Sequence, residues 1–184
     1  MKRLFSLMSL VSLLLLLAAC AGLIGPRDVE VPVSRLQQGL ERRFPYNQRY
    51  LGLFDVTAVN PRLAMQPELN RIATSVDLSV APVLALGRGI RGSLTVSGVP
   101  RVDMSRGVLL LGDPRVDELR IPGLDQAFGG QLANIASFLA AQLLGDLPVY
   151  SFSSSDLRYA GVQFAPQKIV TQPDRLVVTF APVN

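Results

Sequence analysis

Alternation of apolar and polar residues between Leu51 and Ile121 is the feature that most constrains the fold of this chain. The segments Thr74–Val80 and Arg91–Val96 alternate with a period of two, the period at which successive side chains of a strand face opposite sides of a sheet. Turn residues, mainly proline and glycine, separate the alternating runs. The pattern predicts four long strands in an antiparallel meander, and long strands favour a sheet that twists and curls.

The segment from Leu124 to Leu144 is apolar at helical spacing, and Asp125 is its only charged residue. Large side chains would lie on one side of such a helix and small side chains on the other, with only a narrow polar strip between them. A helix that is apolar nearly all round is buried on most sides. We therefore predict one long buried helix. A transmembrane span is the alternative, which Gln131 and Asn134 disfavour.

A shorter helix is predicted before the alternating region. Ser34 would begin it, with Gln37 as its capping-box partner. Its apolar stripe would be formed by Leu36, Leu40 and Phe44, and Pro45 would end it. A brief strand is expected ahead of this helix, over Val29–Val33.

Strands are predicted again after the long helix, over Pro148–Phe152, Val162–Thr171 and Leu176–Ala181. The complete pattern predicts an α+β fold. In this fold a strongly curved antiparallel β-sheet is wrapped around one long α-helix, with a short N-terminal helix in addition.

The N-terminus is typical of a secretory signal peptide, which we assign to residues 1–19. Lys2 and Arg3 precede an uncharged run from Leu4 to Ala19. This run is shorter than the roughly 20 residues that cross a bilayer as a helix. An N-terminal membrane anchor that remains uncut is the alternative, and Pro26 disfavours it.

The signal ends in Leu17-Ala18-Ala19-Cys20, where Cys20 is the only cysteine of the chain. This tetrapeptide resembles the lipobox of bacterial lipoproteins. The resemblance implies cleavage before Cys20 and acylation of its thiol and new amino group by fatty acids such as palmitate, and a thiolate is the nucleophile for thioether formation. Residues 20–28 would then be a lipidated tether to a membrane. The residue after Cys20 is Ala21 rather than Asp, which by similarity to enterobacterial sorting implies the periplasmic face of the outer membrane.

The residues of the chain do not favour catalysis. It has no histidine, the usual general base and the commonest zinc ligand. A carboxylate pair among Asp113, Asp117 and Glu118 is disfavoured, because Asp113-Pro114 is typical of a turn and consecutive strand residues face opposite sides. The serines between Ser151 and Asp156 are typical of a polar loop. We predict a protein that is not an enzyme and has no metal site and no cofactor.

Arginines account for most of the positive charge of the chain, whose formal net charge is +4. Removing the signal peptide would take away Lys2 and Arg3. The other arginines are spread along the sequence, which favours a solvated surface over an anion-binding patch. We expect no nucleic-acid partner.

Four stretches together resemble a known family: VEVPVSRLQQGLERRFP (29–45), NPRLAMQPELNRIATSVDLSV (60–80), GSLTVSGVPRVDMSRGVLLLGDPRVDEL (92–119) and LPVYSF (147–152). They resemble the YceB-like family of Gram-negative lipoproteins, a domain of unknown function. The resemblance implies a single domain over residues 29–184. It also implies a fold similar to half of the tubular lipid-binding proteins related to bactericidal/permeability-increasing protein, where a curved sheet around a long helix leaves an apolar groove. It implies no catalytic residues.

The expected function is that of a non-enzymatic outer-membrane lipoprotein that binds a lipid or other apolar ligand between sheet and helix. One sheet covers one side of the predicted helix and leaves the other side for a ligand or partner. The candidate groove residues are Phe128, Gly129, Leu132, Ala133, Ile135, Ala136, Leu139 and Ala140. Two alternatives stay open: a groove filled by the protein's own side chains, and a structural lipoprotein that binds a protein partner in the periplasm or outer membrane.

Overall fold

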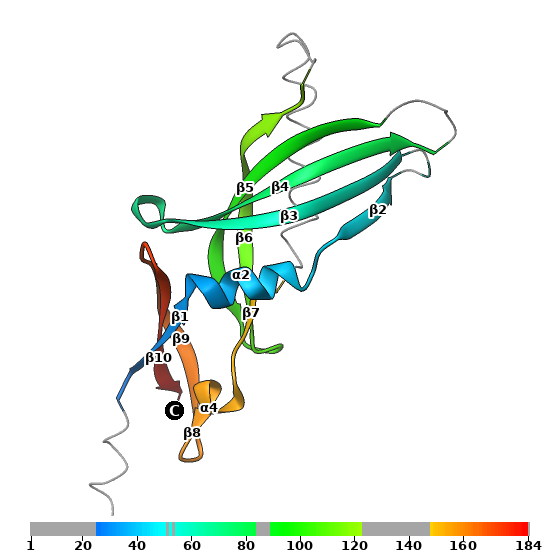
Figure 1. The fold of residues 1–184 in the computed structure, drawn as a ribbon. Helices are drawn as coiled ribbons and strands as arrows, with labels where there is room; N and C mark the ends of the chain where they lie inside the picture. Colours follow the sequence, from blue (N-terminus) through cyan, green and yellow to red (C-terminus); the bar gives the residue numbers. More distant parts are fainter. Residues whose placement is uncertain (1–24, 51, 53, 84–88, 123–147, 184) are drawn as a thin grey trace, which may run out of the picture.

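The computed structural model describes residues 25–50, 52, 54–83, 89–122 and 148–183, and two antiparallel sheets make up most of this part of the chain (Figure 1). The larger sheet has the strand order β2-β3-β4-β5-β6-β7, and the smaller has the order β1-β10-β9-β8. Of the described residues, 67% lie in strands and 13% in helices.

The strands of the larger sheet are β2 (Tyr46–Tyr50), β3 (Phe54–Gln66), β4 (Arg71–Pro82), β5 (Ile90–Asp103), β6 (Val108–Arg120) and β7 (Tyr150–Ser151). Those of the smaller sheet are β1 (Arg27–Pro32), β8 (Arg158–Tyr159), β9 (Val162–Thr171) and β10 (Arg175–Val183). The helices are α2 (Val33–Glu41), the 3-10 turn η2 (Pro67–Leu69) and α4 (Ser154–Leu157).

The predicted antiparallel meander is confirmed, since β3, β4, β5 and β6 pair consecutively. Its strands are bent by breaks in register between Val59 and Arg62 in β3 and at two points in β5. Asn60, at the first break, has a left-handed backbone with φ of 52°. Such bulges increase local twist, and Figure 1 shows the strands of the larger sheet curving along their length.

One face of the larger sheet, here called the inner face, is apolar and contributes to the core. It is formed by alternate residues of three strands: Val56 and Ala58 of β3, Ile72, Thr74, Val76, Leu78 and Val80 of β4, and Leu94 and Val96 of β5. Leu36 and Leu40 of α2 and Phe164 and Phe180 of the smaller sheet belong to the same core cluster. The helix α2 and both sheets are therefore held together by one apolar core.

The predicted single sheet wrapped around one long helix is wrong. The described strands form two curled sheets, and the α-helices in this part of the chain, α2 and α4, are both short. The physical reason is that β1 pairs with β10, so the two ends of the domain complete a second sheet with its own apolar side. Alternation in a sequence predicts strands without showing which strands pair. The helix predicted over Leu124–Leu144 lies outside the described residues.

The predicted start of the first helix also needs correction. The helix begins at Val33, and no side-chain cap is present at its N-cap residue, Pro32. The amide of Gln37 instead donates to the carbonyl of Pro61 at 2.7 Å and accepts from the backbone N–H of Leu63 at 2.8 Å. Gln37 thus joins α2 to the bulged part of β3 rather than capping its own helix.

The SFSSSD segment is more ordered than the predicted polar loop. Ser153 caps α4, because its hydroxyl accepts from the N–H of Asp156 and the Asp156 carboxylate accepts from the N–H of Ser153. This is a capping box. Its serines therefore have a structural role at a helix start.

Candidate functional site

The inner face becomes exposed to solvent at one end of the larger sheet, here called the outer end. Phe54 pairs with Pro82 across β3 and β4, and Val80 pairs with Ile90 across β4 and β5. Phe54 is 42% exposed and Ile90 is 51% exposed, whereas Leu94, further along β5, is fully buried. The buried residues of the core and the exposed residues of the outer end therefore lie on the same face of the sheet.

The alternation of apolar residues in the sequence already places Phe54 and Ile90 on the inner face. Phe54 is in phase with Val56 and Ala58, and Ile90 is in phase with Leu94. Side chains two residues apart on a strand share a face. The phase of both residues can be read from the sequence, but their exposure depends on which other parts of the chain cover them.

A single buried hydroxyl interrupts the inner face. Thr74 is 4% exposed, and its Oγ1 has no hydrogen-bond partner within the described part of the chain. It pairs with Leu63 on one side and Val96 on the other. A buried hydroxyl without a partner is unfavourable by about 1–3 kcal/mol. Thr74 is therefore a buried polar group in the core, about 20 Å along β4 from Val80.

Charged groups near the outer end lie on the opposite face of the sheet. Asp55 is the neighbour of Phe54 in β3, and its carboxylate receives a hydrogen bond of 2.8 Å from the Nε of Arg49. This hydrogen bond is the main reason why the pKa of Asp55 lies below its usual value. Asp55 is thus ionised at neutral pH, and the alternation directs this charge away from the apolar side.

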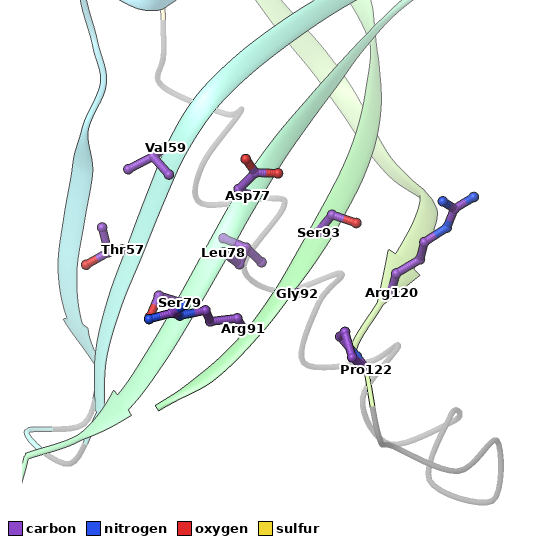
Figure 2. A pocket seen from close by; sticks show the side chains of 10 residues that line it. All are labelled: Thr57, Val59, Asp77, Leu78, Ser79, Arg91, Gly92, Ser93, Arg120 and Pro122. Atoms are coloured by element: carbon purple, nitrogen blue, oxygen red, sulfur yellow. The ribbon is translucent and has the colours of Figure 1, made fainter. Parts of the chain in front are cut away.

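A shallow concavity of about 540 Å³ lies over the neighbouring strands (Figure 2). Asp77, Arg91 and Arg120 are its charged lining residues. Asp77 accepts from the Asn60 amide at 2.8 Å, and Arg120 donates to Glu118 at 2.6 Å. Because two of the three charges already have partners, this concavity is the weaker candidate for a charged ligand.

A polar cluster around Arg71 contains two of the carboxylates considered in the sequence. Arg71 is 9% exposed and donates to the Ser97 hydroxyl at 3.1 Å, to the Ser97 carbonyl at 3.0 Å and to the Asp113 carboxylate at 3.1 Å. The Ser97 hydroxyl donates in turn to Asp117 at 3.0 Å, and the Gln66 amide donates to the same carboxylate at 3.2 Å.

This cluster stabilises the irregular pairing of β5 with β6 rather than forming a reactive site. The two register breaks of this pair lie between Thr95 and Val96 and between Ser97 and Val99, and Asp113 has a left-handed backbone with φ of 47°. Both carboxylates are occupied by donors that hold the strands together. Within the described residues, no group of histidine, cysteine, aspartate and glutamate is arranged to hold a metal ion.

The residues predicted to bind ligand or lipid lie outside the described part of the chain. This applies to Cys20 and to all eight groove candidates between Phe128 and Ala140. None of the described helices has the length and apolar character needed to cross a membrane. Among the described residues, the exposed apolar outer end of the inner face is the candidate for binding an apolar ligand.

Comparison with protein-family models and with curated proteins finds no match to this chain. The resemblance to the YceB-like lipoproteins therefore stays a prediction from the sequence.

Proposed function

We propose that this protein is a non-enzymatic lipoprotein that binds a lipid or other apolar ligand on the inner face of the larger sheet. The continuous apolar face from buried Leu94 to exposed Phe54 and Ile90 is the observation that carries the proposal. Burying such side chains against a ligand is favourable by about 25 cal/mol for each Å² removed from water. The ligand would enter at the outer end.

Thr74, Val76 and Leu94 are already buried by the protein itself. The ligand would therefore cover the exposed part of the inner face around Phe54 and Ile90.

Membrane attachment in this proposal comes from the lipobox-like sequence that ends at Cys20. Acylation there would hold the domain at the periplasmic face of the outer membrane, close to a supply of lipid. A protein partner would then also be a periplasmic or outer-membrane protein.

Binding can be tested with a chain that begins at residue 21, because the described core cluster starts at Val31 and is retained in full. The double variant Phe54→Ser/Ile90→Ser should bind a fluorescent fatty acid about tenfold more weakly than the parent, since it removes apolar contact area. The matched control is Leu69→Ser, because Leu69 is 60% exposed but lies on η2. Equal affinity in the double variant and the parent would contradict a site at the outer end.

The exposure of Phe54 and Ile90 also favours a second function, a structural lipoprotein that binds a protein partner through the same residues. Binding of a free apolar probe by the parent chain distinguishes the two functions. A parent chain that binds no apolar probe would contradict the lipid proposal and favour the structural one.

A further inference from the structure

A concavity of about 550 Å³ between α2 and the segment 148–151 carries three arginines. We name it the basic pocket and define it by its lining residues: Arg35, Gln38, Gly39, Arg42, Arg43, Pro148, Val149, Tyr150 and Ser151. The basic pocket shares no residue with the outer end, and none of its nine lining residues is acidic.

The two walls of the basic pocket are fixed against each other. Gly39 of α2 lies against the carbonyl oxygen of Val149, where even a Cβ would not fit. Val149 is 1% exposed, and its N–H donates to the carbonyl of Leu109 at 2.9 Å. On the other side of α2, Leu36 and Leu40 are buried in the core. The pocket is therefore a preformed feature of the packed domain.

The arginines converge on this pocket through the periodicity of the helix. Arg35 and Gln38 lie three residues apart and Arg42 follows four residues later, a spacing that places side chains on one side of a helix. Arg43 follows directly, and its N–H donates to the carbonyl of Leu40 in the last turn.

These three arginines have no carboxylate partner among the ion pairs of the described residues. Glu41, which precedes Arg42, accepts a hydrogen bond of 2.7 Å from Gln37, and Glu30, five residues before Arg35, pairs with Arg175. Arg35 also lies in the first turn of α2, where the helix dipole disfavours a positive charge. Helix stability therefore does not explain Arg35, and an anion would relieve the repulsion among the three charges.

We propose that the basic pocket binds a phosphate-bearing anion. A guanidinium presents paired N–H donors that match two phosphate oxygens, and such charge-assisted hydrogen bonds are stronger than neutral ones. Gln38, Tyr150 and Ser151 add neutral donors to the lining. The phosphate can belong to a soluble molecule or to the headgroup of a lipid. This site does not depend on the function proposed above.

The test compares two triple variants of the full chain purified in a nonionic detergent. The pocket variant is Arg35→Gln/Arg42→Gln/Arg43→Gln. The control is Arg62→Gln/Arg106→Gln/Arg158→Gln, which removes the same charge from three exposed arginines outside the pocket. Inorganic pyrophosphate is titrated by calorimetry in one arm. In the other arm, nonionic micelles that contain phosphatidylglycerol are titrated with protein, and binding is measured from the phosphorus NMR signal of the lipid.

The pocket variant should weaken binding in at least one arm by about tenfold or more, because each lost charged hydrogen bond contributes on the order of 1.4 kcal/mol. The control should leave binding unchanged. Loss confined to pyrophosphate would assign a soluble phosphate, and loss confined to phosphatidylglycerol would assign a headgroup. Equal loss in both variants, or no binding by the parent in either arm, would overturn the proposal. So would a pocket variant that melts at a lower temperature but binds as the parent does.

Discussion

The carbonyl oxygen of Val149 occupies the position from which a side chain of Gly39 would extend. This contact brings α2, near the start of the domain, against the segment that leads into β7, more than a hundred residues later. A glycine is thus required in the middle of a helix, where it is otherwise less favourable than alanine by roughly 0.5–1 kcal/mol.

Replacing Gly39 should destabilise the domain. In Gly39→Ala the new methyl group would collide with Val149, and overpacking of this kind costs about 1–3 kcal/mol. Urea unfolding measures the change. Gly25→Ala is the control, because nothing lies within 4 Å of a Cβ built there. A Gly39→Ala variant as stable as its parent would mean that the two segments separate easily.

Leu94 should be a stability determinant of the larger sheet. It is fully buried on the inner face, and truncation of such residues to alanine costs about 2–5 kcal/mol because a cavity remains. Its neighbour Ser93 lies on the opposite face, so Ser93→Ala should change the free energy of unfolding by less than about 0.5 kcal/mol. Similar losses from Leu94→Ala and Ser93→Ala in thermal unfolding would argue against this assignment of faces.

Arg71 should contribute more to stability than its ion pair with Asp113 suggests. The Asp113 side chain is 73% exposed, so Asp113→Asn should cost less than about 1 kcal/mol. Arg71→Met removes the donors to the buried Ser97 and should cost about 1–3 kcal/mol. Chemical denaturation of both variants gives the comparison, and the opposite order would indicate that the carboxylate is the main partner.

The turn between β5 and β6 should become less stable in acid. The Asp103 carboxylate accepts a hydrogen bond of 2.6 Å from the Ser105 hydroxyl, which is the main reason why the pKa of Asp103 lies below its usual value. A lowered pKa means that this stabilisation is complete above the ordinary value of 3.8 and is lost as the pH falls through the lower value in the folded protein.

The unfolding midpoints of wild type and Asp103→Asn measure this effect. Wild type should be more stable at neutral pH, and the difference should disappear as the pH falls through the lowered pKa of Asp103. Ser105→Ala should reduce the same pH dependence although the carboxylate remains. A constant difference between wild type and Asp103→Asn at every pH would contradict the role of the ionised carboxylate.

Lipidation at Cys20 can be tested independently of the fold. Cys20→Ser removes the thiol that would form the thioether, so the variant should accumulate as uncleaved precursor without a radioactive fatty-acid label. Gel migration and label incorporation measure the two effects. Labelled Cys20→Ser protein would contradict both the acylation and the proposed outer-membrane location.

The sequence was informative where local physics decides the structure. The strand predicted over Val162–Thr171 coincides with β9, and Leu36 and Leu40 are buried as their helical spacing indicates. Period-two alternation also predicted the antiparallel meander. These features depend on residues that are close together in the sequence, so the sequence pattern alone indicates them.

Features that depend on distant residues were not predictable in the same way. The pairing of β1 with β10 joins the ends of the domain, and no local pattern indicates it. Gln37 was assigned to a capping box, but its amide binds Pro61 and Leu63 on another strand. The bulge beside Asp117 likewise interrupts the alternation from which its orientation was inferred.

The sequence also could not predict that the arginines of the basic pocket lie together. In the sequence they are part of a dispersed positive charge, and only the approach of the 148–151 segment to α2 brings the exposed Arg35, Arg42 and Arg43 into the lining of one concavity. The outer end is similar, because the phase of Phe54 and Ile90 is visible in the sequence but their exposure is not.

The pairing of β6 has a consequence for association between copies of the protein. Among the described strands, β7 pairs only with Val108 and Leu109, so the rest of β6 has β5 on one side and no strand on the other. This remaining edge contains Pro114, which lacks an N–H, and five charged residues: Asp113, Arg115, Asp117, Glu118 and Arg120. A second molecule that paired with this edge would strip water from these charges and lose a backbone hydrogen bond at the proline. Edge-to-edge pairing of two molecules through this part of β6 is therefore disfavoured, also where the proposed acylation would hold them close together.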